Sequence, residues 1–181
     1  MHSEALERIE KQMEELPILQ YAVLPTDRIC FEERVRMICR DECPQYGSTW
    51  SCPPAVGTVE ECRQRCQKYA NCFVFSTIAE VRDITNMEET LATRQDHEEI
   101  TRQVVEMFRA EFGDVMALST ESCAICENCC YKENRPCRFP DRMFPCVESH
   151  GILVTDLAEM GEMEFNNGAN VVTWFSVVFY G

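Results

Sequence analysis

The chain lacks the features that mark several large classes of protein. It contains no run of about 18 apolar residues, so no transmembrane helix is expected. The first residues, MHSEALERIEKQMEEL, include no apolar segment of the kind found in signal peptides, which favours a cytoplasmic location. Basic residues are scarce, with 17 Lys and Arg against 31 Asp and Glu and a net charge of −14. Such a charge argues against binding to nucleic acid or to anionic membrane surfaces.

Motifs for the common cofactors and nucleophiles are also missing. Neither of the phosphate-binding patterns GxGxxG and GxxxxGK[ST] occurs, so no nucleotide site of those types is expected. The CxxxCxxC run of radical S-adenosylmethionine proteins and the serine nucleophile elbow are absent as well. The sequence therefore gives no sign of a second cofactor or of a serine hydrolase.

Cysteine, by contrast, is abundant. The chain has 13 cysteines in 181 residues, an odd number that cannot all pair within one monomer. A cysteine-rich chain without an export signal is expected in a reducing compartment, where thiols bind metal rather than form disulfides. The length suits one domain with its own core, and we expect residues 1–181 to form a single cysteine-rich metal-binding domain.

The second group of cysteines, near the C-terminal end, has the stronger signature. Its compact run consists of Cys123, Cys126 and Cys129. Three further cysteines follow this run, namely Cys130, Cys137 and Cys146. Two gaps of two residues place three thiols on one tight loop, which favours a [4Fe–4S] cluster over the separated CxxC pairs of zinc ribbons. Cys137 is the expected fourth ligand, Cys130 is an alternative to Cys129, and Arg138 can balance the negative charge of the cluster.

The first group of cysteines is looser. Cys39, Cys43 and Cys52 supply three candidate ligands, and Pro53 and Pro54 fix the backbone directly after the third. The sequence leaves the fourth ligand open among Cys62, Cys30 and Cys66. Cys62 and Cys66 also suit a buried helical face, where free cysteines pack as small apolar side chains.

Hydrophobic periodicity predicts alternating helices and strands. Helices are expected over 2–16, from Thr58 with a Thr58–Glu61 capping box, over 85–112 with a Thr85–Glu88 capping box and Gly113 at its end, and over 156–160. Strands are expected over 18–24, 72–78, 115–119, 152–155 and 171–180, and much of 30–57 is expected to be loop. The predicted fold is α/β, a single layered domain whose central sheet carries helices and holds two cysteine-rich metal-binding loops at its edge.

The remaining cysteine, histidine and glutamate candidates are mostly expected to have structural or surface roles. Cys146 is a candidate extra ligand or reactive thiol, and Cys72 is expected to pack in a core strand. His150 is expected to be structural, whereas His2 and His97 lie on polar helical stretches and are expected to be solvated. Glu148 is expected to be a surface charge or a partner of Arg142.

Several stretches together resemble a known family. They are CPQYGSTWSCPPAVGTVEEC, CAICENC, PCRFPDRMFP, VESHGILV and NNGANVVTWFSVVFY. The pattern CPP…CxxCxxC…PCRxP is similar to that of a cysteine-rich predicted metal-binding family, a domain of unknown function common in anaerobic bacteria and archaea. The resemblance implies one site of Cys39, Cys43, Cys52 and the candidate Cys62, and a second of Cys123, Cys126, Cys129 and Cys137. Many members of the family have serine at the position of Cys146, so the resemblance implies that this thiol lies outside the core ligand set.

The expected function follows from these sites. Two [4Fe–4S] clusters without another cofactor motif indicate electron transfer or a redox accessory role, with a partner protein that offers a basic docking patch. One alternative is a metalloenzyme that uses an iron with an open coordination position in the first site. Another is an interaction module in which zinc holds the loops together.

Overall fold

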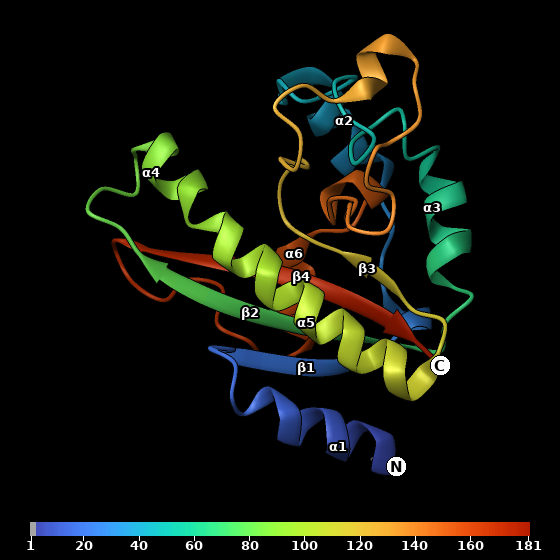
Figure 1. The fold of residues 1–181 in the computed structure, drawn as a ribbon, viewed down its shortest axis with the longest axis vertical. Helices are drawn as coiled ribbons and strands as arrows, with labels where there is room; N and C mark the ends of the chain where they lie inside the picture. Colours follow the sequence, from blue (N-terminus) through green and yellow to red (C-terminus); the bar gives the residue numbers. More distant parts are fainter. Residues whose placement is uncertain (1–2) are drawn as a thin grey trace.

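A four-stranded antiparallel sheet forms the middle of the molecule (Figure 1). The structure, a computed structural model, describes residues 3–181. The strands lie in the order β1-β2-β4-β3, with bounds β1 Gln20–Pro25, β2 Asn71–Glu80, β4 Val171–Tyr180 and β3 Met116–Leu118. The two central strands pair along their whole length, from Asn71 opposite Tyr180 to Glu80 opposite Val171.

Both faces of this sheet are buried. Successive side chains of a strand point to opposite faces, and β2 is rich in aromatic and β-branched residues that suit such a position. Phe73 and Phe75 of β2 pack on one face, whereas Cys72 and Val74 pack on the other. Each face therefore needs its own cover.

Helices α1 (Glu4–Met13) and α5 (Arg94–Phe112) cover one face (Figure 1). Ile9 of α1 and Val104 and Phe108 of α5 are fully buried against the sheet. The α5 helix ends at Gly113, whose φ of +77° favours glycine and whose N–H donates to the Arg109 carbonyl.

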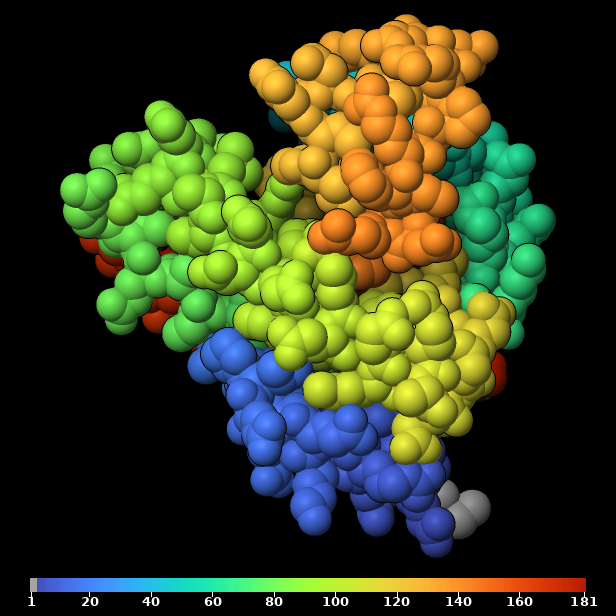
Figure 2. All heavy atoms as spheres, in the orientation of Figure 1, coloured from blue at the N-terminus to red at the C-terminus, as the bar shows by residue number. Residues whose placement is uncertain are grey.

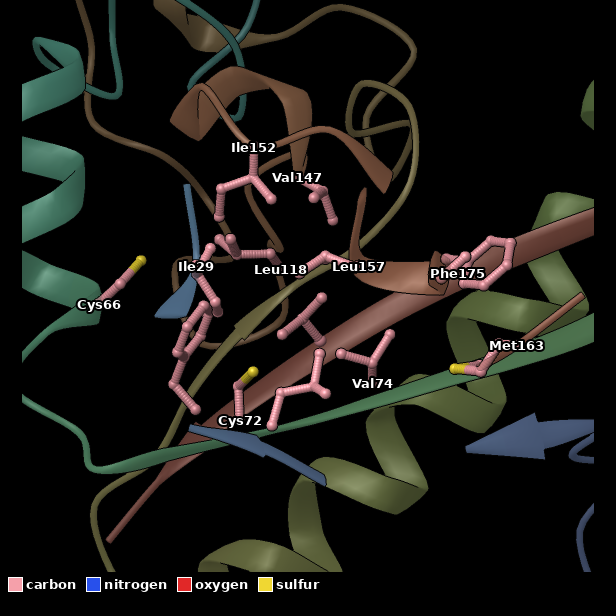
Figure 3. Packing of buried hydrophobic residues seen from close by; sticks show 14 residues of the cluster. Ile29, Cys66, Cys72, Val74, Leu118, Val147, Ile152, Leu157, Met163 and Phe175 are labelled. Carbon is pink, nitrogen blue, oxygen red and sulfur yellow. The ribbon is translucent and has the colours of Figure 1, made fainter. Parts of the chain in front are cut away.

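The opposite face packs against α6 (Val154–Met160) and the segment before it, as Figure 3 shows. Val147, Ile152 and Leu157 meet Val74 and Phe175 of the sheet there. The remaining helical elements are α2 (Glu33–Glu42), α3 (Val59–Cys66), α4 (Met87–Ala92) and the short 3₁₀ turns η1 (Thr26–Arg28), η2 (Cys130–Glu133) and η3 (Glu148–His150). Within residues 3–181, no helix combines the length and the apolar character required to cross a membrane.

Much of the sequence-based prediction is confirmed. The fold is a layered arrangement of helices on a central sheet, and β4 has the predicted bounds. Thr58 and Glu61 form the expected capping box, in which each side chain binds the other residue's backbone N–H. The helix predicted over 2–16 is α1, and His2 lies outside the described residues.

Much of 30–57 is loop, as predicted, whereas two other local predictions were wrong. The segment 30–57 also contains a helix that the sequence analysis did not identify, α2, which holds Cys39 in its last turn. The helix predicted from Thr85 starts one residue later: Asn86 caps α4, the Thr85 hydroxyl donates to Asp83, and a break at Thr93 separates α4 from α5. The strand predicted over 152–155 is the approach to α6, because Val154 already lies in the helix.

The two cysteine-rich loops lie side by side at one end of the molecule (Figure 1). The first cysteine loop, residues 43–58, joins α2 to α3, and the second, residues 119–147, leaves the edge strand β3 as predicted. A backbone hydrogen bond joins the two loops, in which the Cys146 N–H donates to the Ser51 carbonyl over 3.2 Å. Within the second loop, Ser119 forms a parallel bridge with Cys146.

Candidate metal centres

The end of α2 and the turn after it position the first group of thiols. Cys39 lies in the last turn of α2, and Cys43 is the residue that caps the helix, with its N–H donating to the Cys39 carbonyl over 3.3 Å. The loop then turns back at Gly47, whose φ is +67° and whose N–H donates to the Pro53 carbonyl over 2.8 Å. This turn returns Cys52 towards the other two cysteines.

The three thiols of the first group interact electrostatically. Burial is the main cause that raises the pKa of Cys39 to about 11, and the nearby Cys43, Glu148 and Cys52 add to it. Burial also raises the pKa of Cys52, which hydroxyl groups partly offset. Both thiols therefore carry protons at neutral pH in the absence of metal, and metal binding has to release those protons.

Cys62 has different neighbours. Its thiol lies fully buried on α3, donates to the Val56 carbonyl over 3.5 Å and accepts from Arg65 Nη2 over 3.1 Å. Arg36 is a charged neighbour of both Cys62 and Cys39, but the cysteine that interacts with Cys62 is Cys66.

The other candidates for a fourth ligand also lie elsewhere. Cys66 and Cys72 belong to the apolar core (Figure 3), which agrees with the packing predicted for Cys72. Cys30 is exposed at the surface.

Cys146 lies on the side of the first group. Its thiol donates to Glu148 Oε2 over 2.8 Å, and Cys52 is one of the groups that interact electrostatically with it. The Cys39 thiol is 4.0 Å from the Glu148 carbonyl, so Glu148 touches both cysteines. The prediction that Glu148 is a surface charge or an Arg142 partner was wrong, because its partly buried carboxylate contacts the Cys146 thiol instead.

The second group of thiols surrounds a common pocket. Side chains from the whole of the second cysteine loop line it, together with one residue of the first loop, and the set is Trp50, Cys123, Ile125, Cys126, Cys129, Cys130, Cys137, Arg138, Phe139 and Met143. The loop closes through a turn in which Asn134 has φ +53° and the Arg135 N–H donates to the Cys130 carbonyl over 3.1 Å. All four predicted ligands of the second site thus face one space.

Arg138 supplies positive charge to this pocket. Its guanidinium hydrogen-bonds the Cys126 side chain, which is the main cause that raises the pKa of Arg138, and Cys130 contributes as a nearby charge. A second hydrogen bond, from Nη1 to the Asn128 carbonyl over 3.0 Å, fixes its orientation. A permanently charged guanidinium is suited to a group of thiolates around an anionic cluster.

Within residues 3–181, no three His, Cys, Asp or Glu side chains are arranged as they would be around one metal ion. Iron–sulfur clusters are held by cysteine thiolates, so the residues that line this pocket fit such a cluster in donor chemistry.

A cleft runs beside the second group, between it and the helices α4 and α5. Figure 2 shows the hollow between the green helices and the orange loop. One part, of about 640 Å³, is lined by Thr49 of the first loop and by Cys123, Cys126 and Cys129 of the second. The second group is therefore accessible from solvent on this side.

His97 and His150, the histidines among residues 3–181, hydrogen-bond hydroxyl groups. His97 was predicted to be solvated, but it is 1% exposed and hydrogen-bonds Thr77 Oγ1 and Ser176 Oγ, each over 2.8 Å. His150 is equally buried and hydrogen-bonds Ser149, in agreement with a structural role. Burial lowers the pKa of His97 to about 4 and is the main cause that lowers that of His150 to about 3.

Sequence reasoning missed one residue that organises the site. Ser51 is fully buried, and its hydroxyl accepts a hydrogen bond from the Cys123 N–H over 2.8 Å. No spacing rule could identify it, because its partner lies 72 residues further along the chain. Its position between Trp50 and Cys52, directly before a predicted ligand, is the one local hint.

Comparison with known proteins agrees with the cysteine-rich sites. A protein-family model described as "Predicted metal-binding protein (DUF2284)" matches residues 22–180. The chain is thus a predicted metal-binding protein with many cysteines, and it belongs to this family, whose function is unknown. Searches among curated proteins and among solved structures find no significant match.

Proposed function

We propose that the protein binds two iron–sulfur centres, each a [4Fe–4S] cluster, and serves as an electron carrier or redox accessory. The observation that carries this proposal is the pocket shared by Cys123, Cys126, Cys129 and Cys137 next to Arg138. Thiolates are the ligands that iron–sulfur clusters require, and the compact spacing of Cys123, Cys126 and Cys129 favours a cluster over the separated CxxC pairs of a zinc ribbon. Membership of a predicted metal-binding family supports the binding of metal in general.

The ligand sets of the two centres differ in how completely the contacts support them. The second centre takes Cys123, Cys126, Cys129 and Cys137. The first takes Cys39, Cys43 and Cys52, and the family resemblance offers Cys62 as the candidate for the fourth. The hydrogen bonds of Cys62 with Val56 and Arg65 favour packing, so we propose Cys146 as fourth ligand, on the basis of its proximity to Cys52 and Glu148.

The proposed role follows from what accompanies the centres. The sequence has no motif for a second cofactor, and its net charge of −14 suits docking on a basic patch of a partner protein. We place the protein in the cytoplasm, where a reducing environment keeps the 13 cysteines available for metal.

Substitution of one ligand tests the proposal. Protein purified without oxygen should absorb broadly near about 400 nm and bleach with dithionite, as iron–sulfur proteins do. Cys126→Ser should lose about half of the iron, since serine oxygen is a poor replacement for a soft thiolate and the first centre keeps its own ligands. Cys30→Ser is the matched control, because that cysteine is exposed, and it should keep all of its iron. Equal iron in the two variants would contradict the proposal.

A second candidate function is catalysis at the first centre. Cys39, Cys43 and Cys52 lie together whereas Cys62 does not, and an iron without a fourth thiolate has a position open to substrate. Cyanide or a small thiol would then change the paramagnetic resonance spectrum of the reduced protein. A spectrum that neither cyanide nor a small thiol changes favours the electron carrier. Colourless protein with stoichiometric zinc would favour the interaction module instead.

A further inference from the structure

Three consecutive residues connect the two groups of thiols. Cys52 belongs to the first group, and the hydroxyl of its neighbour Ser51 lies 3.6 Å from the Cys52 sulfur. The same hydroxyl accepts the hydrogen bond from the Cys123 N–H over 2.8 Å. Two short contacts through one side chain therefore join a thiol of the first group to the backbone of a cysteine of the second.

Trp50 extends this connection into the second group. Its indole lines the pocket that Cys126 and the other thiols surround, and its Nε1–H donates to the Arg135 carbonyl over 3.0 Å. The ring also packs edge-on against Tyr131, with centroids 5.0 Å apart. A residue of the first loop is thus part of the wall of the second site.

Two more contacts fix the same boundary. The Ser122 side chain, next to Cys123, is a hydrogen-bonding neighbour of the Cys52 thiol. The Ser51 carbonyl accepts from the Cys146 N–H over 3.2 Å, so Ser51 is held from both sides. Ser51 is 0% exposed, so these contacts lie in the interior of the protein.

We infer that the segment Trp50–Cys52 joins the two sites into one unit of two clusters, in which Cys52 and Cys123 are the facing ligands. This inference rests on the proposed function, because it requires a centre at each group. Paramagnetic metal centres whose ligands are joined through one side chain interact magnetically. An electron accepted from an external one-electron donor can then pass from one centre to the other, with no bond made or broken and no change in the total charge of the pair.

Paramagnetic resonance of the whole protein, reduced with dithionite, tests the inference. Cys126→Ser retains the first centre alone and Cys39→Ser retains the second alone, so their spectra add up to what two independent centres would give. We expect the fully reduced wild type to show splitting and broadening that this sum does not reproduce. A wild-type spectrum equal to the sum would overturn the inference.

A titration of the wild type alone covers the case in which either variant fails to fold. At low degrees of reduction the molecules carry one reduced centre each, and interaction features should grow only as the second centre is reduced. A line shape that stays constant through the titration would overturn the inference while both centres are present. Protein without iron would instead overturn the proposed function, and iron analysis of the same sample distinguishes the two failures.

Discussion

Acid should destabilise the layer between α5 and the sheet through His97. The ring is 1% exposed, and burial lowers its pKa from 6.5 to about 4, so the folded protein keeps it neutral while the unfolded chain protonates it. A folded-state pKa below the unfolded one gives stability that is fully present above pH 6.5 and is lost as the pH falls towards 4. The difference corresponds to about 3 kcal/mol over that range, at 1.36 kcal/mol per pKa unit.

The variant His97→Gln isolates this contribution. At pH 7 it should be less stable by about 1–3 kcal/mol, because glutamine cannot satisfy both Thr77 Oγ1 and Ser176 Oγ in the geometry of the ring. Between pH 6.5 and 5.5 the wild type should lose about 1 kcal/mol more than the variant, since only the wild type gains this proton on unfolding. His150, whose pKa is also lowered, contributes equally to both proteins and cancels.

Native-state hydrogen exchange provides the measurement without complete unfolding. The amides of Val177 and Val178, in the centre of β4, report the free energy of opening at each pH after correction for intrinsic exchange rates. Parallel pH dependences in the wild type and in His97→Gln would refute the reasoning.

Three further outcomes are expected. Cys146→Ser should lower the metal occupancy of the first centre and shift its paramagnetic resonance spectrum. Cys62→Ser should leave that spectrum unchanged and cost about 1 kcal/mol of core stability. The reverse pattern would identify Cys62 as the fourth ligand. Arg138→Gln should make the second centre harder to reduce by removing a nearby positive charge, and an unchanged potential would contradict the electrostatic role of the guanidinium. Metal-free protein should keep slow amide exchange in β2 and β4 but exchange fast over 43–57 and 123–147; loss of protection in the central strands as well would show that metal holds the whole fold.

The central strands and the helix boundaries with strong caps could be predicted from the sequence. β4 is a run of β-branched and aromatic residues bounded by Gly168 and the chain end, and Thr58–Glu61 forms a local capping box. Both signals depend on neighbours in the sequence. It is harder to predict the cap when two neighbouring residues both suit the position. Asn86 rather than Thr85 caps α4, for example.

Features that depend on distant partners could not be predicted. His97 lies on a helix with charged neighbours in sequence, and only the arrival of Thr77 and Ser176 from the sheet makes its burial favourable. The same holds for Ser51, which bonds the backbone of Cys123, and for the position of Cys146 beside Glu148. The spacing of the cysteines identified candidate ligands but not which of their thiols lie together in the fold.

The most direct test of the central claim is the metal content of the protein purified in the absence of oxygen. Two [4Fe–4S] clusters require about eight irons and about eight acid-labile sulfides per chain, with little zinc. That stoichiometry, in a brown protein that dithionite bleaches, is the result predicted here. A colourless protein that contains stoichiometric zinc and no sulfide would contradict it.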